Sequence, residues 1–407
     1  FCFFLTEVSE YDTKQPTFLW TFLIMHIVAL KDSSQPDETR VPLIPDDAAR
    51  LVSAGARISV ESGLGNPIQV DDTAFIEAGA AAVTDRVQLL GEADMILRIG
   101  KPTREEIAGM RPGCIYVSLL DPFNERSLID AFADKGVSAI SMEMIPRTTR
   151  AQKMDVLSSQ ASLAGYIAVI VGSERLGKIM PMMMTPAGTI KPSRVFVVGA
   201  GVAGLQAIAT AKRLGARVDA FDTRPVVEEQ VKSLGGRFVK IDLGDTGETA
   251  GGYAKALTDE QIQKQREGMA RVCASSDLVI TTAQLFGRKA PLIITREMID
   301  GMQPGSVIID LAVESGGNVE GSEVDREIDI NGVRIVGLRN LPGRVPVHAS
   351  QMFSSNLFNL IDEFWDAEAK AFDLRMDDEL IQGCLITHEG RICNPVIARH
   401  YGIDTDA

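Results

Sequence analysis

The most constraining feature of the sequence is a short apolar strand that runs directly into a glycine turn and then into a helix. The apolar residues 195–198 are followed by Gly199, Gly201 and Gly204 in the spacing G-x-G-x-x-G. The first glycine permits a tight turn, the second lets the backbone approach a pyrophosphate, and the third allows the helix to pack closely on the strand. The free N–H groups and the dipole at the helix start, where Val202 stands, favour negative charge. This segment predicts a Rossmann dinucleotide-binding domain.

An acidic residue at the end of the next apolar strand strengthens this prediction. Residues 216–222 read A-R-V-D-A-F-D, and Asp222 comes 18 residues after Gly204 (222 − 204), as the dinucleotide fingerprint requires. A carboxylate there can accept both ribose hydroxyls and repels a 2′-phosphate, which favours NAD(H) over NADP(H). Arg224 keeps the alternative open, because an arginine near this position can accept that phosphate. The alternative to a cofactor-binding domain is a Rossmann-like fold that has lost the ability to bind a nucleotide.

Composition excludes several other classes of protein. The chain has 41 Lys and Arg against 55 Asp and Glu, for a net charge of −14, so a nucleic acid would meet net repulsion. The five cysteines are scattered without a C-x-x-C pair, which indicates reduced, mostly buried thiols. The four histidines lack metal-ligand spacing to another His or Cys, so we predict no metal site.

The N-terminal residues read differently from the rest of the chain. Residues 1–24 start with Phe and are rich in aromatic side chains, and we expect this extension to lie outside the fold, with Met25 as the natural start. The alternative is an arm that touches a membrane or a partner. The apolar segment 17–30 contains His26 and is shorter than the ~20 residues of a membrane helix. We therefore expect a soluble, cytoplasmic protein without a membrane span.

Two alternating strand–helix units predict the fold class. In the first unit, strands are expected at 27–30, 58–61, 95–99, 114–119 and 137–142, and helices at 45–54, 73–82 and 125–135. In the second unit, strands are expected at 194–198, 217–221, 236–240, 277–282, 306–310 and 333–337. Such alternation predicts an α/β protein of two domains, each an open, mostly parallel sheet with helices on both faces.

Two long helices are expected to connect and cover these units. A helix over 154–176 joins the domains, and the methionines of 180–184 that follow it are interpreted as adaptable packing. A second helix over about 349–372 needs a surface to cover, for which the first domain is our hypothesis. The predicted domains are therefore 25–160 plus 345–407, and 161–344, with the chain crossing between them twice.

A polar segment at the domain border carries the chemistry. Arg147, Gln152, Asp155 and Ser158 combine a bidentate donor, an amide, an acid and a hydroxyl, and the last three recur at every third position. On a loop that runs into a helix they would fall on roughly one side. A helix entry with a surface ion pair is the structural alternative.

Four motifs together resemble a known family. The sequence R-x-x-R-A-Q-x-M-D-x-L-S-S-Q at 147–160, the turn V-V-G-A-G-V-A-G-L-Q, F-D-T-R after it and G-G-Y-A-K around Tyr253 resemble proton-translocating nicotinamide nucleotide transhydrogenase. The resemblance is to its peripheral NAD(H)-binding component, the soluble alpha-subunit domain of the split bacterial type, and covers about 25–395. The first motif is highly specific, whereas the glycine turn is not.

The resemblance implies a function and a set of site residues. In that family the component binds NADH, a separate component binds NADP(H) above a membrane proton channel, and hydride passes directly between the two nicotinamides. A homodimer, a peripheral position on the cytoplasmic side of the inner membrane, and a separate membrane subunit are implied as well. The implied nicotinamide site consists of Arg147, Arg150, Gln152, Asp155 and Ser158. The implied adenosine site consists of Gly199, Gly201, Val202, Gly204, Asp222, Thr223 and Arg224, and the implied mobile loop carries Gly252 and Tyr253.

The chemistry of these residues agrees with that implication. Direct hydride transfer needs two nicotinamides in contact with water excluded, and not an acid or base at the reacting carbon. We therefore assign Arg147, Gln152, Asp155 and Ser158 orienting roles rather than acid–base roles.

Two alternative functions remain open. In a relative of alanine dehydrogenase, Arg40 and Lys101 would hold pyruvate and Glu314 would stand about where the catalytic Asp does, but residues 117–121 lack the expected histidine. We interpret Arg40 and Lys101 instead as structural ion-pair residues. The second alternative is a module that senses NADH without catalysis.

Overall fold

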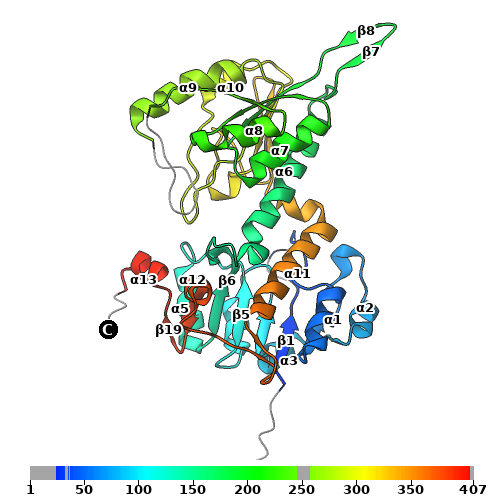
Figure 1. Cartoon of the computed structure of the whole chain (residues 1–407), viewed down its shortest axis with the longest axis vertical. Coiled ribbons are helices and arrows are strands. Elements are labelled where there is room, and N and C mark those ends of the chain that lie inside the picture. The colour runs from blue at the N-terminus through cyan, green and yellow to red at the C-terminus, as the bar shows by residue number, and fades with distance from the viewer. Residues whose placement is uncertain (1–23, 33–34, 36, 245–256, 404–407) are drawn as a thin grey trace, which may run out of the picture.

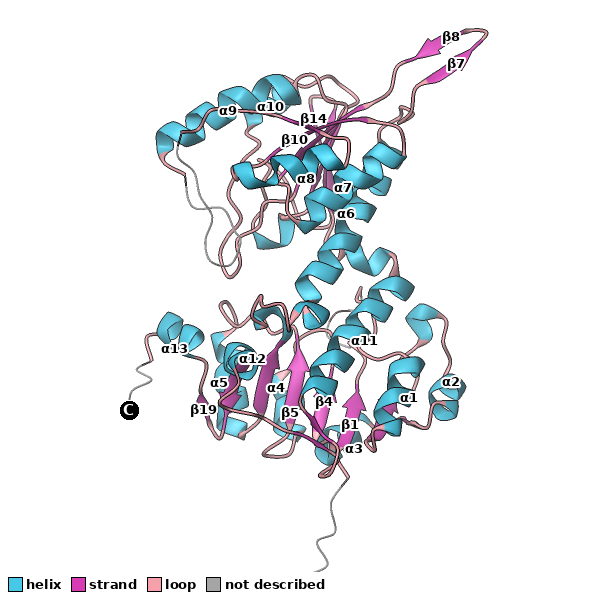
Figure 2. Ribbon diagram, viewed as in Figure 1, coloured by secondary structure: helices cyan, strands magenta, loops and turns pink. Residues whose placement is uncertain are grey.

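The computed structural model describes residues 24–32, 35, 37–244 and 257–403. The described chain folds into two lobes joined by two helices, α6 (Val156–Arg175) and α11 (Pro346–Glu363), which run side by side through the waist (Figure 1). Each lobe is built around one large sheet with helices on both faces (Figure 2). The predicted α/β fold class is confirmed.

The first lobe contains an eight-stranded sheet in the order β19-β18-β6-β5-β4-β1-β2-β3. Its strands are β1 (His26–Ala29), β2 (Arg57–Glu61), β3 (Ala81–Val83), β4 (Met95–Leu97), β5 (Ile115–Ser118), β6 (Ser138–Ser141), β18 (Leu385–His388) and β19 (Arg391–Ile392). Strands β1 to β6 pair in parallel, and β18 pairs antiparallel with β6 on one side and with β19 on the other. The carboxyl ends of β1 and β5 point toward the second lobe (Figure 2).

Helices cover both faces of this sheet because each face carries its own apolar core. One face packs against α1 (Pro45–Ser53), α2 (Asp72–Glu77), α11 and α12 (Glu379–Cys384). The other face packs against α3 (Arg86–Glu92), α4 (Arg104–Gly109), α5 (Arg126–Lys135) and α13 (Pro395–Tyr401). Since Phe353, Leu357 and Ile361 of α11 are fully buried in the first core, the predicted surface for this helix is confirmed.

The second lobe contains a seven-stranded sheet in the order β11-β10-β9-β12-β13-β15-β14. Its strands are β9 (Arg194–Val198), β10 (Arg217–Phe221), β11 (Arg237–Phe238), β12 (Leu278–Thr281), β13 (Val307–Asp310), β14 (Arg326–Ile330) and β15 (Val333–Gly337). Helices α6, α7 (Val202–Arg213) and α8 (Glu228–Ser233) cover one face, and α9 (Asp259–Cys273) and α10 (Arg296–Asp300) cover the other. The first strand, β9, has its sequence neighbours on one side and the later strands on the other, which is the switch point at which doubly wound sheets bind nucleotides.

Helix α6 differs from the sequence prediction in one respect. With 20 residues and a mean hydropathy of 1.4 in its most apolar window, it meets the length and composition of a membrane span, although no such segment was expected. In the structure Ile167, Ala168 and Val171 of α6 are buried in the core of the second lobe. Its apolar character is therefore accounted for by packing between α7 and the sheet.

Three further expectations are wrong in detail. The predicted helix 73–82 ends at Glu77 and is followed by strand β3. The predicted helix 349–372 ends at Glu363, because the chain turns there into the small hairpin of β16 (Trp365–Asp366) and β17 (Ala371–Phe372).

The methionine run is the third such case. Met180 is buried in the core of the second lobe, as predicted, whereas Met183 and Met184 lie exposed in a hairpin of β7 (Met183–Thr185) and β8 (Gly188–Ile190). This hairpin projects from the second lobe (Figure 1).

Candidate functional site

The glycine turn has the geometry that its spacing predicts. Gly199 has φ +97°, and a Cβ there would stand 2.5 Å from Thr282 Oγ1. A Cβ on Gly204 would fall far inside contact distance of the Gly199 carbonyl oxygen, so α7 approaches β9 as closely as only glycine allows. A Cβ on Gly201 would meet no described atom within 4 Å. The space in front of the second glycine is therefore open to a ligand.

The N-terminus of α7 offers that space a set of backbone donors. Gly201 is the N-cap and supplies no side-chain cap, and Val202 at the first helical position is 43% exposed. The first N–H groups of a 12-residue helix with its dipole behind them are a ready-made phosphate site. The residues present thus fit the pyrophosphate of a dinucleotide.

Asp222 stands beside this turn, immediately after β10. Its Oδ2 accepts from the N–H of Ala200 inside the turn at 2.8 Å, which ties the acid to the glycine loop. Its two oxygens also accept from Nε and Nη2 of Arg224 at 3.0 and 2.9 Å, and Thr223 lies between the two residues. The predicted ribose acceptor is therefore engaged by the arginine that sequence reasoning treated as its rival. A ribose that binds the carboxylate has to share it with Arg224 or displace Arg224.

A buried polar cluster supports the turn from behind, and sequence reasoning missed it. Thr282 Oγ1 donates to the Gly199 carbonyl at 3.1 Å. Asn318 Oδ1 accepts from the N–H of Ala283 at 3.0 Å, and Asp310 Oδ2 accepts from the N–H of Asn318 at 3.0 Å. Because Asp310 and Asn318 are fully buried, this cluster fixes the backbone next to the glycine turn. The available signal was that polar residues follow β12 and β13 at the carboxyl edge of a predicted parallel sheet.

The polar segment 147–158 forms a loop that leads into α6. Asp155 is the N-cap of α6 and accepts from Ser158 through its N–H at 2.9 Å and its hydroxyl at 2.6 Å. Gln152 begins the short 3-10 turn η3 (Gln152–Met154) and is exposed, as is Arg147. The structure brings Asp155 and Ser158 into direct contact and leaves the amide and the guanidinium on the surface of the loop.

Arg150 lies in the same loop but faces the C-terminal elements of the first lobe. Its guanidinium pairs with Asp378, and its Nε is 3.8 Å from Glu363 of α11. Arg150 thereby ties the loop to the scaffold of the first lobe. The remaining predicted site residues, Gly252 and Tyr253, lie outside the described residues.

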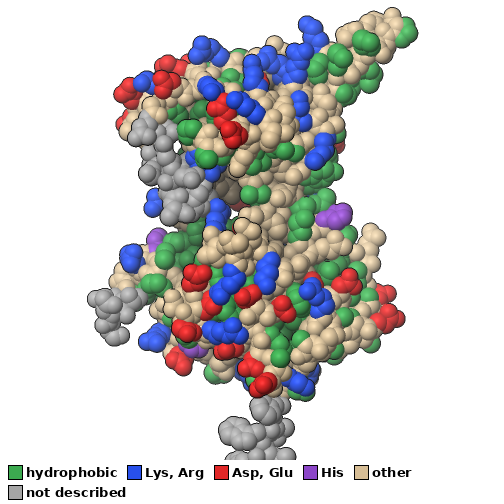
Figure 3. Space-filling view, in the orientation of Figure 1, with side chains coloured by type: hydrophobic (Ala, Val, Ile, Leu, Met, Phe, Trp, Pro, Cys, Tyr) green, Lys and Arg blue, Asp and Glu red, His purple; other side chains and the backbone are tan. Residues whose placement is uncertain are grey.

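Helix α6 brings the loop and the glycine turn together. Gly165 of α6 faces the start of α7 so closely that a Cβ there would overlap the carbonyl oxygen of Ala203. Ser158 and Gly165 are seven residues apart on α6, which corresponds to about 10 Å along the helix axis. The phosphate turn of the second lobe and the polar loop at the border of the first therefore lie within the span of one extended dinucleotide. In the space-filling view the surface is hollowed between the two lobes (Figure 3).

A set of polar contacts lies near this region, and Glu38 joins the two lobes by accepting from Asn340 Nδ2 at 3.3 Å. Arg40 pairs with Glu38 at 2.6 Å and donates to Gln160 of α6 at 3.0 Å. Glu314 accepts from the N–H of Asn340 at 3.3 Å, and burial raises the pKa of its carboxyl group above the ordinary range. The expected structural role of Arg40 as an ion-pair residue is confirmed.

Lys101 also behaves as expected from its structural interpretation. Its ammonium pairs with Asp121 at 3.3 Å and with Glu125 at 2.9 Å. The structure adds one histidine near these residues that the sequence could not place. His400 of α13 stacks edge-on against Phe123, with its Nε2 3.0 Å from the Phe123 carbonyl oxygen.

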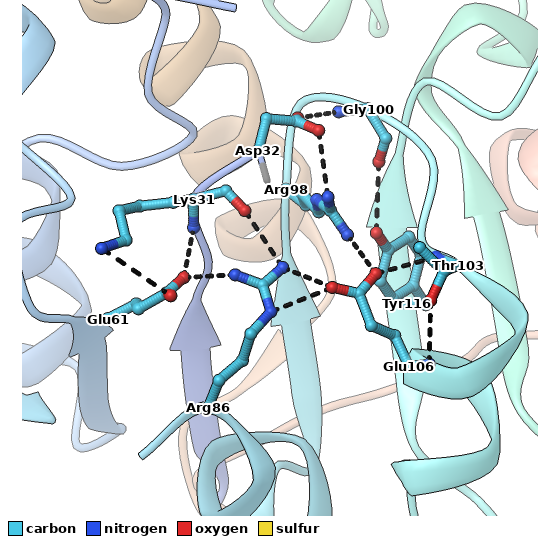
Figure 4. Close-up of polar contacts among 9 residues, drawn as sticks. All are labelled: Lys31, Asp32, Glu61, Arg86, Arg98, Gly100, Thr103, Glu106 and Tyr116. Carbon is cyan, nitrogen blue, oxygen red and sulfur yellow. Dashed lines mark hydrogen bonds and ion pairs between the residues drawn. The ribbon is translucent and has the colours of Figure 1, made fainter. Parts of the chain in front are cut away.

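A network of charges closes the carboxyl edge of the first sheet beside the waist (Figure 4). Arg98 is fully buried and pairs with Asp32 at 3.1 Å and with Glu106 at 2.7 Å. Arg86 bridges Glu106 and Glu61, each at 2.6 Å. The members of the network in Figure 4 are Lys31, Asp32, Glu61, Arg86, Arg98, Gly100, Thr103, Glu106 and Tyr116. Its three cations and three carboxylates balance in charge, so we interpret it as a scaffold rather than an anion site.

The network has a consequence for the site. Lys31 and Asp32 come two and three residues after the end of β1 at Ala29, and in sequence they precede Glu38 and Arg40. By holding Asp32 through Arg98 and the N–H of Gly100 at 2.6 Å, the network anchors the base of the segment that reaches the second lobe.

The cysteines take no part in this region. The four that the structure describes, Cys114, Cys273, Cys384 and Cys393, are free thiols. Burial raises the pKa of Cys114, Cys273 and Cys384 to about 12, so these thiols stay protonated at neutral pH. For these four cysteines the predicted free and mostly buried thiols are confirmed, and Cys2 lies outside the described residues.

Comparison with protein-family models assigns nearly all of the chain. Residues 29–164 match the model described as "Alanine dehydrogenase/PNT, N-terminal domain". Residues 168–395 match "Alanine dehydrogenase/PNT, C-terminal domain". The boundary between the two matches falls within α6.

Individual proteins show the same relationship. The chain is 42% identical over 377 residues to the first segment of the split NAD(P) transhydrogenase subunit alpha of Rhodospirillum rubrum, and the match covers 91% of this chain and 98% of that relative. It is 27% identical over 388 residues to alanine dehydrogenase of Bacillus subtilis (strain 168), with 93% and 95% covered. The crystal structure of transhydrogenase from Sinorhizobium meliloti superposes with a TM-score of 0.81 at 42% identity, covering 90% of this chain and 99% of that one.

Proposed function

The chain belongs to the alanine dehydrogenase/PNT family, and on this premise we propose that it is the NAD(H)-binding component of a transhydrogenase. In this proposal the chain holds NADH so that hydride passes directly to NADP⁺ on a partner component. The relationship to transhydrogenase alpha subunits over most of the chain rests on the 42% identity with the Rhodospirillum rubrum protein. The proposal that the chain holds NADH for hydride transfer is argued from the residues of the site.

One observation carries the proposal. The contact between Gly165 and the backbone of Ala203 places the phosphate-binding turn against the same helix that carries Asp155 and Ser158. The adenosine half of NADH would lie over Gly201, Asp222 and the start of α7. The nicotinamide half would reach the loop of Arg147 and Gln152, which are exposed.

The residues of the loop suit positioning rather than proton transfer. Bound NADH supplies the hydride, and the chain has only to hold the ring and exclude water. Gln152 offers an amide that can bond to the carboxamide of the ring, and Arg147 offers a fork of donors. Asp155 and Ser158 form a fixed pair at the N-terminus of α6 that can receive ribose hydroxyl groups. We propose that Gly252 and Tyr253 close over the nucleotide.

The partners follow from the same proposal. A separate NADP(H)-binding component faces the nicotinamide, and a separate membrane subunit moves protons when hydride is transferred. We propose that the chain sits at the cytoplasmic side of the inner membrane through these partners. The complex would then act as a proton-translocating, Re/Si-specific NAD(P)⁺ transhydrogenase, with this chain as one component.

We further propose that two copies of the chain associate through the projecting hairpin. Met182, Met183, Met184 and Ile190 of this hairpin are between 44% and 75% exposed. A lone two-stranded hairpin with exposed apolar side chains is only marginally stable in water. A homodimer would bury these side chains and stabilise the hairpin.

The proposed domain division keeps 25–160 plus 345–407 as the first domain and 161–344 as the nucleotide-binding domain. It is supported by the two sheets, since β18 and β19 of the C-terminal segment extend the sheet of the first lobe. Residues 1–23 of the N-terminal extension lie outside the described residues. We propose that it contributes nothing to nucleotide binding.

An amino acid dehydrogenase is the rival function. This function is supported by the family match and by the 27% identity with alanine dehydrogenase of Bacillus subtilis. Against it, Lys101 is held by two carboxylates and residues 117–121 contain no histidine. His400 lies near that segment, but its ring packs on Phe123. Oxidation of NADH by the chain with pyruvate and ammonia would favour this rival.

The experiment that tests the proposal changes the loop amide. We expect Gln152→Asn to slow single-turnover hydride transfer to NADP⁺ on a partner component by about tenfold or more, because the shorter side chain shifts the ring away from near-attack geometry. Rapid-quench samples, in which chromatography separates NADH from NADPH, measure this rate. A Gln152→Asn variant that transfers hydride at the wild-type rate would contradict the orienting role.

A further inference from the structure

The loop that carries the proposed nicotinamide site is held from behind by a side chain of α11. Asn356 is 7% exposed, and its Nδ2 donates to the carbonyl oxygen of Lys153 at 2.9 Å. Its Oδ1 accepts from the hydroxyl of Ser159 on α6 at 2.7 Å. One buried amide therefore joins the turn η3 to the first turns of α6. This contact links segments about 200 residues apart in sequence.

Two neighbours on the same face of α11 act on the same turn. Asn359 also donates to the Lys153 carbonyl, at 3.1 Å, and Glu363 pairs with the ammonium of Lys153 at 2.8 Å. Positions 356, 359 and 363 are three and four residues apart, which places them on one face of the helix. Of the three, Asn356 is the buried one and the one that also contacts α6.

The point of attachment lies between the proposed site residues. Gln152 precedes Lys153, and Asp155 follows two positions later. Met154 is fully buried in the core of the first lobe. The peptide between Lys153 and Met154 is thus fixed by the Asn356 amide and by the buried Met154 side chain. Gln152 stays exposed.

We propose that Asn356 is the positioning residue of the nicotinamide loop, and this inference rests on the proposed function. Asn356 touches no reacting group. It sets the register of η3 against α6, so that Gln152 faces the carboxamide of the nicotinamide ring while Asp155 faces the ribose of the same nucleotide. A misplacement of about 1 Å in such a loop can cost about a hundredfold in rate.

Asparagine is suited to this position because it both donates and accepts in one plane. Asn356→Asp keeps the size and the acceptor toward Ser159. It replaces the donor toward Lys153 with an oxygen, so two acceptors face each other in a buried place. The loop then has to shift, whereas the helix keeps its packing.

The test compares binding with transfer in the full-length chain. We expect Asn356→Asp to lower the rate of hydride transfer to NADP⁺ on a partner component by about tenfold or more at saturating NADH. We expect the dissociation constant for NADH to change by less than about threefold, because the adenosine half is held by Asp222 and the glycine turn. Rapid-quench sampling with chromatographic separation of NADH and NADPH gives the rate, and fluorescence titration with NADH alone gives the dissociation constant.

Ser354→Ala is the matched control. Ser354 is buried on the same helix, but it bonds to the N–H of Ile44 and to Asp47 instead of the loop. We expect this variant to lose thermal stability and to transfer hydride at the wild-type rate. An equal loss of transfer in Ser354→Ala would overturn the proposal, because it would show a general effect of α11. Wild-type transfer in Asn356→Asp would overturn it as well.

A second variant keeps the test decisive if Asn356→Asp does not fold. Asn359→Asp alters the half-buried donor to the same carbonyl, and we expect a loss of transfer of about threefold with unchanged NADH binding. An unchanged rate in that variant would then overturn the inference. Absence of transfer in the wild-type chain would instead overturn the proposed function and this inference with it, so the two failures are distinguishable.

Discussion

At the residue scale, Asp222 has two tasks that compete. It accepts from the N–H of Ala200 and so shapes the glycine turn, and it pairs with Arg224. Because Arg224 partly neutralises the carboxylate, the repulsion of a 2′-phosphate is weaker than a lone aspartate would give. In the proposed function, the preference for NADH over NADPH would therefore depend on both residues.

This arrangement predicts the effect of Asp222→Asn. We expect the dissociation constant for NADH to rise about tenfold and the preference over NADPH to fall, because the amide cannot accept from both ribose hydroxyls and Arg224 is released toward a phosphate. Parallel titrations with NADH and NADPH measure both effects. A variant that kept full preference for NADH would contradict the role of Asp222. Asp219→Asn, within β10 and paired with Arg237, serves as the control.

The sequence predicts some of these residues better than others. Gly199, Gly201 and Gly204 were predictable because the backbone geometry that each position needs is local. Thr282 and Asn356 were not, because their partners lie 83 and 203 positions away in sequence. The ion pair of Arg150 with Asp378 was hidden for the same reason.

At the scale of elements, α6 is the element on which the site depends. Its start carries the polar loop, its middle contacts α7, and its end leads to the hairpin. Its position was predictable from the three- and four-residue spacing of apolar residues. The ends of other elements were not predictable, since β3 was predicted as the end of a helix and α11 was predicted to end nine residues too late (372 against 363). Propensity does not distinguish a helix from the strand or hairpin that follows it when tertiary pairing decides.

The crossing of α6 and α7 gives a prediction at this scale. We expect Gly165→Ala to raise the dissociation constant for NADH by about tenfold and to lower the melting temperature, because the added methyl group must push the start of α7 away from α6. Ser162→Ala is the control, since Ser162 is one turn earlier on α6 and bonds to the carbonyl oxygen of Ser158. Titration with NADH and a thermal melt decide the outcome. Unchanged binding in Gly165→Ala would show that the close crossing is not required.

At the scale of the whole molecule, two lobes are tied at one waist and carry the two halves of one site. The loop of Arg147 and Gln152 belongs to the border of the first lobe, and the glycine turn belongs to the second. Contacts of Arg40 and of Thr39, whose hydroxyl donates to the carbonyl of Gly343 at 2.5 Å, fix the lobes together on one side. The fold class and the two sheets followed from the alternation of strands and helices, whereas the antiparallel β18 and β19 at the sheet edge did not.

The projecting hairpin gives a prediction for the assembly. We expect Met184→Glu to convert a dimer into a monomer, because the charge would be buried in the proposed interface. Light scattering after size-exclusion chromatography measures the mass. Val87→Glu is the control, because Val87 on α3 is 75% exposed, as Met184 is, but lies on the first lobe. A dimer that survives Met184→Glu, or a wild-type monomer, would contradict the role of the hairpin.

The central claim is that this chain holds NADH for a second protein and does not consume a substrate of its own. Rapid mixing of the chain and NADH with a purified NADP⁺-bound partner component, followed by an alkaline quench and chromatographic quantification of NADH and NADPH, tests it most directly. The account predicts a rapid loss of NADH matched by NADPH, which requires both proteins and is absent when the partner is replaced by pyruvate and ammonia. Oxidation of NADH by the chain alone with pyruvate and ammonia, or no binding of NADH, would contradict it.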